Sequence, residues 1–173
     1  MDTKLTGKTR IESDLIGARE IPAEALYGVQ TLRGIENFSI SKFRLSEYPL
    51  FIKGLAITKM AAAMANFELG LLTVEQKDAI IAACGEILDG KHHDQFPVDM
   101  IQGGAGTTTN MNANEVIANR ALELMEHERG EYQYCSPNDH VNCSQSTNDA
   151  YPTAIHIGMY FKHLQLLPHL EEL

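Results

Sequence analysis

The chain has few of the residues that mark secreted or nucleic-acid-binding proteins. Its 173 residues include three cysteines, no tryptophan, and 14 Lys plus Arg against 23 Asp plus Glu, which gives a formal net charge of −9. Three widely spaced cysteines form neither an even disulfide set nor a Cys-x-x-Cys pair, so we expect free thiols in a reducing compartment. The acidic balance argues against nucleic acid as a partner, because phosphate binding requires a basic surface.

Long apolar runs and a secretion signal are also missing. The N-terminal MDTKLTGKTR contains no apolar signal core. The most apolar stretch, residues 50–72, falls short of the ~18 apolar residues of a membrane-spanning helix, since polar residues interrupt it at Lys53, Lys59, Asn66 and Glu68. We therefore expect a cytoplasmic protein with no membrane partner. The composition, 44% apolar and 21% charged, is typical of a globular domain.

The patterns predict a mainly α fold. Pro49 precedes an alanine-rich helix over about 50–69, and its sparse polar residues do not gather on one face, which predicts burial on most sides. Thr73 and Gln76 have the capping-box spacing that begins a second helix, and Gly90 is placed to end that helix in a left-handed cap.

Two further helices are expected, after an irregular N-terminal region. The first 50 residues are rich in turn formers and carry short extended pieces such as 25–29. One later helix covers 112 to about 128, and the last has Pro152 in its first turn, where a missing N–H costs nothing. The chain stops at Leu173 within helical periodicity and without a cap. We expect it to be the N-terminal part of a longer protein.

Two polar loops carry the candidate chemistry. Residues 102–110, Gln-Gly-Gly-Ala-Gly-Thr-Thr-Thr-Asn, combine glycines that let the backbone approach a ligand with the positive end of the next helix. They lack the Gly-Lys-Ser/Thr ending of a nucleotide loop. Residues 144–149, Ser-Gln-Ser-Thr-Asn-Asp, offer neutral hydroxyls and amides, which suit a carboxylate better than a phosphate. For each loop the alternative is a turn with a helix cap.

Other polar residues have simpler interpretations. Asp139 and His140 form an acid–base pair only if adjacent side chains face one site, which is uncommon. His92 and His93 are neighbours that point apart and have no third ligand at helical spacing, so a solvated loop is expected there and not a metal site. The helical carboxylates are expected on solvated faces; they include Glu86 and Glu123.

Taken together, these segments resemble conserved blocks of the aspartase/fumarase superfamily. The matching blocks are Gly-Gly-Ala-Gly-Thr at 103–107, Asn-Met-Asn-Ala-Asn-Glu-Val at 110–116, Pro-Asn-Asp-His-Val-Asn at 137–142 and Gln-Ser-Thr-Asn-Asp at 145–149. The resemblance begins at residues 10–14 and includes 27–31 and 36–38. It is strongest to the aspartate ammonia-lyase branch, through Gly-Glu-Tyr-Gln-Tyr at 130–134 and Ala-Tyr-Pro-Thr at 150–153. Ser136 and Thr147 stand where fumarases typically carry His and Ser.

The resemblance implies reversible anti elimination of ammonia from L-aspartate to give fumarate, with no required cofactor and no metal ligand. Removing the proton beside the side-chain carboxylate pushes a second negative charge onto that group, so the site must bind the dianion better than the substrate. By resemblance, Ser146 and Thr147 contact substrate carboxylate, Thr107 and Asn148 hold the amino group, and Asn110 shapes that pocket.

The resemblance also implies what this chain lacks. The general base of the family is a serine in a mobile Gly-Ser-Ser block, which does not occur in these 173 residues, so no catalytic residue is assigned here. Residues 1–143 correspond to the N-terminal lyase domain, and 144–173 to the first, truncated helix of a central bundle. Each site of the family is assembled from three subunits of a homotetramer. Two alternatives stay open: a fumarase or other superfamily lyase, and a non-catalytic helical interaction fragment in which both loops are only caps.

Overall fold

The computed structural model describes residues 7–172, and most of them are helical. The helices are α1 (Val29–Asn37), α2 (Pro49–Glu68), α3 (Val74–Leu88), α4 (Thr107–Leu124) and α5 (Thr147–Glu171), with short turns of helix at η1 (Leu45–Glu47), η2 (His93–Gln95) and η3 (Pro137–Val141). Strands β1 (Thr9–Asp14) and β2 (Gly17–Pro22) pair as an antiparallel hairpin. The mainly α fold class is confirmed. Residues 1–6, part of the N-terminal segment 1–10 in which no signal core was found, and Leu173, where an uncapped end was expected, lie outside the described residues.

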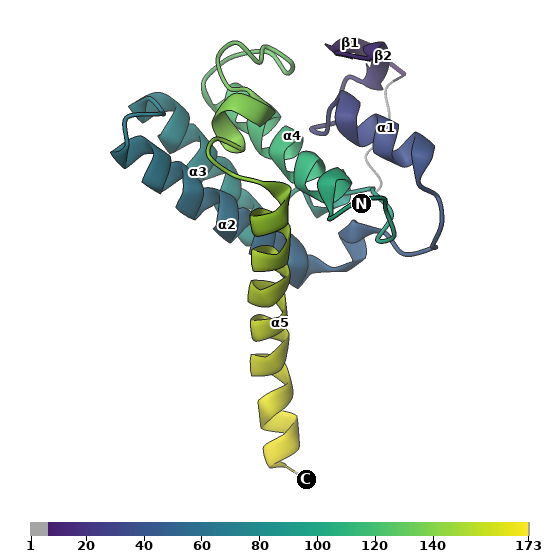
Figure 1. Ribbon diagram of the computed structural model, residues 1–173, viewed down its shortest axis with the longest axis vertical. Helices are drawn as coiled ribbons and strands as arrows, with labels where there is room; N and C mark the ends of the chain where they lie inside the picture. The colour runs from purple at the N-terminus through teal and green to yellow at the C-terminus, as the bar shows by residue number, and fades with distance from the viewer. Residues whose placement is uncertain (1–6, 173) are drawn as a thin grey trace.

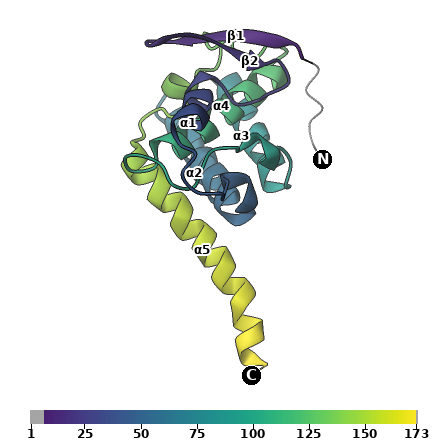
Figure 2. The ribbon, with the colours of Figure 1, turned by 90° about the vertical axis from the view of Figure 1, so that its right-hand side faces the viewer.

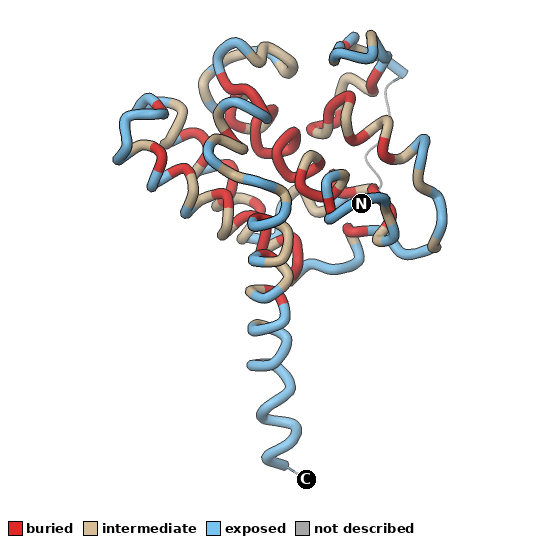
Figure 3. Tube along the Cα trace, viewed as in Figure 1, coloured by how far each residue is buried: buried red, intermediate tan, exposed pale blue. Residues whose placement is uncertain are grey.

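The elements form a compact body from which one helix projects. Figure 1 shows α2 and α3 side by side, α4 through the middle, and the hairpin at the end of the body that carries α1. In Figure 2 the hairpin lies across that end, and α5 extends away at the opposite end. Burial follows this arrangement in Figure 3, where α4 is almost wholly buried and the outer part of α5 is exposed. The buried residues of α5 are Ala150, Ala154 and Gly158.

Glycines allow the helices to pack closely around α4 and α5. A Cβ atom on Gly54 of α2 would overlap the carbonyl oxygen of Ala154 in α5, and one on Gly34 of α1 would overlap the side chain of Thr108 in α4. The main apolar core lies between α2, α3, α4 and the first turns of α5, and includes Ile52, Ile80 and Ile117. The two polar loops of the predicted site therefore lead into helices, α4 and α5, that the core holds in place.

Helix α2 is long and apolar enough, by length and composition alone, to cross a membrane. It packs against α3 and α5, and its Lys59 is fully buried. A buried core helix passes the same length and composition test, so the test is weak evidence for a membrane span. The expected lack of a membrane partner stays a prediction.

The local signals for α3 are confirmed. Thr73 Oγ1 accepts from the Gln76 backbone N–H at 3.2 Å, and Gln76 Oε1 accepts from the Thr73 N–H at 3.1 Å. Gly90 has φ +89° and donates to Ile87 O, while Lys91 donates to Glu86 O, as in a Schellman cap. All three cysteines are free, as expected.

Three predicted boundaries were wrong. Helix α4 begins at Thr107, five residues before the predicted start, and ends at Leu124. Helix α5 begins at Thr147, because Ser146 caps it: Ser146 Oγ accepts from Asn148 N–H, and the Asp149 carboxylate accepts from Ser146 N–H. Pro152 therefore lies inside the helix and not in its first turn. Its missing N–H leaves the Asn148 carbonyl without the usual helical donor.

Residues 7–50 contain more regular structure than expected. Residues 25–29 are not a strand, and α1 begins at Val29. The hairpin was missed because its turn depends on Asp14, whose Oδ1 accepts from the N–H groups of Ile16 and Gly17. Arg33 of α1 binds the same carboxylate at 2.8 Å and joins the hairpin to the helical body. The predicted domain boundary at 143/144 falls in the loop between η3 and α5 and stays a prediction.

Candidate functional site

The two predicted loops line one cavity where α4 and α5 begin. The cavity has a volume of about 630 Å³. Gly104, Ala105 and Gly106 come from the first loop, and Asn148 comes from the second, together with Tyr151 and Pro152 of α5. Met100, Ile101 and Gln102 complete the lining. The structure therefore brings together two segments that sequence reasoning selected separately.

A direct hydrogen bond joins the two segments inside the protein. Asn110 of α4 is buried, and its Nδ2 donates to Thr147 Oγ1 at 3.2 Å. We call Asn110, Thr147 and Asn148 the polar wall: Asn110 and Thr147 share this hydrogen bond and are not among the cavity-lining residues, whereas the next residue, Asn148, lines the cavity. Their roles toward a substrate stay predictions.

The other two predicted residues stand at the helix starts themselves. Thr107 is the first residue of α4 and is exposed beside the cavity-lining Gly106. Ser146 is the N-cap of α5, and its hydroxyl accepts from Asn148 N–H at 3.2 Å. A capping role is therefore observed for Ser146, and contact with a substrate is an additional role that remains predicted.

The glycine loop is held by its neighbours in an unusual backbone conformation. Gly104 and Gly106 have φ of +73° and +91°, which glycine adopts readily. The ring of Tyr151 packs so closely on Gly106 that a Cβ atom there would overlap it. Gln102 closes the loop from the other side, because its Oε1 accepts from Thr109 N–H at 2.9 Å and its Nε2 donates to Thr109 Oγ1 at 2.6 Å.

Lys59 is a residue at this wall that sequence reasoning missed. It is fully buried, and its Nζ donates to Asn142 Oδ1 and Gln145 Oε1, each at 2.9 Å. Burial lowers the pKa of Lys59 to about 7. Asn142 Oδ1 also accepts from Asn110 Nδ2 at 3.0 Å, so Lys59 is two hydrogen bonds from Asn110. The available signal is a lysine next to the alanine-rich part of α2, which in the sequence only interrupts an apolar run.

The adjacent Asp139 and His140 do not face one site. Asp139 Oδ2 accepts from Ser136 Oγ at 2.9 Å, whereas His140 Nδ1 accepts from Ser136 N–H at 2.7 Å and His140 Nε2 lies 3.2 Å from Gln76 Nε2. Burial lowers the pKa of His140. These contacts are structural ones at η3, so the geometry supports no acid–base pair there.

The neighbouring histidines likewise contact different groups. His92 Nε2 lies 2.8 Å from Glu86 Oε2, and His93 Nε2 lies 2.9 Å from Ile87 O. In residues 7–172 no group of three His, Cys, Asp or Glu side chains is arranged to hold a metal ion.

The expectation of solvated carboxylates was wrong for Glu86 and Glu123. Glu86 pairs with Arg120 at 2.6 Å and links α3 to α4, and Glu123 pairs with Arg120 and Arg129. The hydrogen bond from Arg120 lowers the pKa of Glu86 to about 2. These ion pairs hold helices together away from the cavity.

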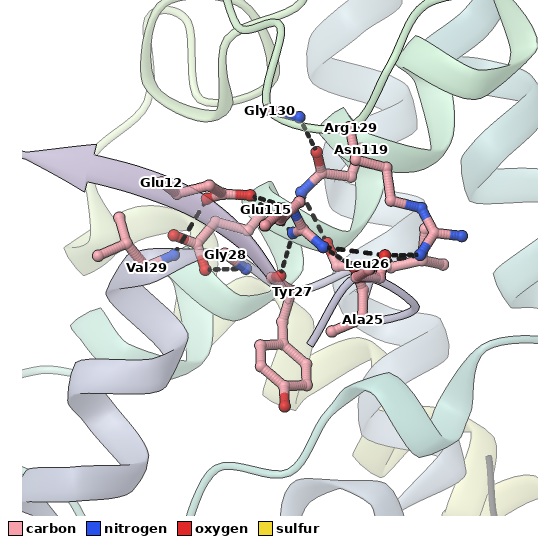
Figure 4. Close-up of polar contacts among 12 residues, drawn as sticks. Glu12, Ala25, Leu26, Tyr27, Gly28, Val29, Glu115, Asn119, Arg129 and Gly130 are labelled. Atoms are coloured by element: carbon pink, nitrogen blue, oxygen red, sulfur yellow. Dashed lines mark hydrogen bonds and ion pairs between the residues drawn. The ribbon is translucent and has the colours of Figure 1, made fainter. Parts of the chain in front are cut away.

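Residues of several motif blocks form buried contacts outside the cavity lining. Glu115 of α4 is buried, and its carboxylate accepts from the N–H groups of Gly28, Gln30 and Thr31 at the start of α1. Glu12 accepts from Val29 N–H in the same cluster (Figure 4) and also from Tyr132 OH. Burial raises the pKa of Glu115. These motif residues therefore orient α1 against α4 and do not line the cavity.

The fold and the paired loops are those of a lyase. The family described as Lyase matches residues 17–173, and the chain belongs to this family. Among curated relatives, it is 59% identical over 164 residues to the aspartate ammonia-lyase of Helicobacter pylori, covering 95% of this chain and 35% of that protein. It is 56% identical over 170 residues to the aspartate ammonia-lyase of Escherichia coli K12, covering 98% of this chain and 36% of that protein. The chain thus spans about a third of the length of these relatives.

Solved structures show the same fold. A fumarate lyase:delta crystallin from Brucella melitensis, bound to cobalt, superposes with a TM-score of 0.93 at 51% identity, covering 95% of this chain and 36% of that chain. A class II fumarase from Schistosoma mansoni superposes with a TM-score of 0.79 at 39% identity, covering 87% of this chain and 32% of that chain. The architecture predicted from the resemblance, the N-terminal part of an aspartase/fumarase-type lyase, is confirmed.

Proposed function

We propose that this chain is the N-terminal part of an aspartate ammonia-lyase, which converts L-aspartate reversibly to fumarate and ammonia. The observation that carries the proposal is the polar wall, in which Asn110 of α4 donates to Thr147 of α5 and the next residue, Asn148, lines one cavity with the glycine loop. Its groups are neutral donors and acceptors at helix N-termini. The identity of 56–59% to curated aspartate ammonia-lyases supports the choice of substrate.

The chemistry of such a wall suits this elimination. Removal of the proton beside the side-chain carboxylate produces a dianion, and preorganised hydroxyls, amides and helix N-termini stabilise that charge more than they stabilise the substrate. Ser146 and Thr147 supply hydroxyls at the positive end of α5, where a carboxylate is favoured. Thr107 and Asn148 are proposed to hold the amino group.

The remaining parts of the proposal concern the whole protein. The serine base comes from a segment outside these 173 residues, and the working enzyme is a cytoplasmic homotetramer whose sites combine residues of three subunits. Its partner is the small-molecule substrate. Ser136 stands where fumarases typically carry His, which favours aspartate over malate as substrate.

The test uses the full-length protein with aspartate and with malate, and follows fumarate by ultraviolet absorbance. Activity on malate alone would overturn the proposed substrate. Thr107→Ala and Ser146→Ala are each expected to lower kcat about a hundredfold with folding intact, as for the loss of a transition-state donor.

A matched cap separates catalysis from capping. Thr73 begins α3 with the same reciprocal cap that Ser146 makes at α5, and it lies outside the cavity lining. Thr73→Ala is expected to cost about 1 kcal/mol of stability with kcat unchanged. If Ser146→Ala behaves like Thr73→Ala, the loops are only caps and the non-catalytic alternative is correct.

A further inference from the structure

Lys59 carries an ammonium group in the core with neutral partners. It is 0% exposed, and its two hydrogen-bond acceptors, Asn142 Oδ1 and Gln145 Oε1, are both amide oxygens. Among residues 7–172 no carboxylate forms an ion pair with it, and the Asp149 carboxylate acts on its charge only from beyond ion-pair distance. Burying an unpaired charge is costly, and an apolar side chain of similar volume would fill the same space more cheaply. Its position beside the site therefore needs an explanation other than packing.

The ammonium group determines which way the Asn142 amide points. An ammonium group donates hydrogen bonds and accepts none, and a neutral amine that faces two amide oxygens still donates to both of them. Asn142 therefore turns its oxygen toward Lys59, where this oxygen also accepts from Asn114 Nδ2 at 3.2 Å, and its Nδ2 donates to Gln145 O at 3.1 Å. The two ends of an amide side chain have nearly the same shape, so such a neighbour decides between its two orientations.

The orientation of Asn142 determines that of Asn110. Because Asn142 Oδ1 accepts, Asn110 presents its Nδ2, which donates to Asn142 Oδ1 at 3.0 Å and to Thr147 Oγ1 at 3.2 Å. Thr147 Oγ1 thus accepts from inside the protein, and its own proton is available to a ligand. The same orientation leaves Asn110 Oδ1 buried with no hydrogen-bond partner among the described residues.

We propose that Lys59 is a positioning residue that sets the direction of the hydrogen-bond chain from Lys59 through Asn142 and Asn110 to Thr147. The chain makes Thr147 a donor, which suits a carboxylate, and leaves Asn110 an acceptor, which suits an ammonium group. An amino acid with a carboxylate near its amino group has both. This inference rests on the proposed function, because it deepens the role given there to Thr147 and Asn110.

The first test compares Lys59→Met with Lys53→Met in the full-length protein. Both lysines belong to α2, and Lys53 is partly exposed, so the two variants lose the same charge from the same helix. We expect Lys59→Met to lower kcat/KM for aspartate about a hundredfold, and Lys53→Met to stay within about twofold of wild type. A folded Lys59→Met with the kcat/KM of Lys53→Met would overturn the inference. Absence of fumarate from the wild-type protein would instead overturn the proposed function.

The second test asks whether Lys59 acts through Thr147. Thr147→Val removes the hydroxyl at the end of the chain, and the Lys59→Met/Thr147→Val pair completes a double-mutant cycle. If Lys59 acts through Thr147, the double variant is expected to lose little more kcat/KM than the worse single variant. A general structural role predicts that the two losses multiply, and that result, or no loss in Thr147→Val, would overturn the inference.

If Lys59→Met does not fold, Lys59→Gln replaces it in the test. A glutamine amide can donate to the oxygens of Asn142 and Gln145, which Lys59→Met would leave without a donor, but it can also accept, so it no longer fixes the direction of the chain. Lys59→Gln is therefore expected to fold, as measured by thermal unfolding, and to lower kcat/KM about tenfold or more. Wild-type activity in this folded variant would equally overturn the inference.

Discussion

Buried polar side chains do most to define this molecule at the scale of single residues. Lys59, Asn110 and Glu115 are each almost inaccessible, and each contacts a segment remote in sequence. Glu115 satisfies three backbone N–H groups at the start of α1, which would otherwise lack helical partners. Lys59 differs, because both of its hydrogen-bond acceptors are neutral amide oxygens. The lowered pKa of Lys59 is measurable as a dependence of the protein's stability on pH.

We predict that Lys59 makes the folded protein more stable as pH rises from about 7 toward 9. Its pKa is lowered from 10.5 to about 7 by burial, so within this range the unfolded state binds more protons than the folded state, and stability increases with pH. Above about pH 9 the buried Cys84, whose pKa is raised from 9.0 to about 12, acts in the opposite direction.

Thermal unfolding across this pH range checks the prediction. The unfolding temperature of wild type, relative to that of Lys59→Met, should rise from pH 7 to 9, while Lys53→Met should follow wild type. Parallel curves for wild type and Lys59→Met would show that the lysine has an ordinary pKa in the folded state.

At the scale of helices and loops, close packing holds the site together. Helix α5 lies against α2 where Gly54 meets Ala154 and Gly158 meets Leu50. This contact fixes the first turns of α5, which carry Thr147 and Asn148, relative to α4. The starts of α4 and α5 serve both as helix ends and as cavity walls, so the packing of these helices also positions the polar groups.

We predict that Gly54→Ala destabilises the protein by about 1–3 kcal/mol, the usual range for overpacking. Its new Cβ would overlap the backbone of α5. Gly85 of α3 is a matched control, because it is also helical and a Cβ there meets no atom within 4 Å. Gly85→Ala should stabilise by about 0.4–1 kcal/mol. Equal effects of the two changes on denaturant unfolding would contradict the close α2–α5 contact.

At the scale of the whole molecule, the projecting half of α5 is largely exposed. Met159, Tyr160, Leu164 and Leu170 are each more than two-fifths exposed, although α5 begins in the core. Together they form an exposed apolar surface of the kind that binds other chains. The chain also covers about a third of its curated relatives, and the proposed serine base lies outside it.

We predict that the 173-residue chain alone forms no fumarate from aspartate and associates with itself as its concentration rises. Leu164→Glu with Leu167→Glu should reduce the association measured by light scattering, because both residues lie on the exposed part of α5. Leu69→Glu, a change at an exposed leucine at the end of α2, should leave it unchanged. Fumarate production by this chain, or a monomer at every concentration, would contradict the prediction.

Features set by neighbouring residues were determined by the sequence alone. The Thr73–Gln76 cap and the Gly90 end of α3 depend on groups within five residues, so their chemistry can be identified directly. The motif blocks also identified both loops and the family. The starts of α4 and α5 were missed because the prediction followed apolar periodicity, whereas the first turns of these helices consist of polar residues.

The tertiary structure alone decided which of these groups act together. Asn110 and Thr147 are 37 residues apart, Lys59 and Asn142 are 83 apart, and Gly28 and Glu115 are 87 apart. A lysine in an apolar helix and a glutamate on a polar one look ordinary until packing removes water and leaves each with specific partners. Burial makes those partners necessary, because an unpaired polar group in the core is costly, and burial is a property of the folded chain.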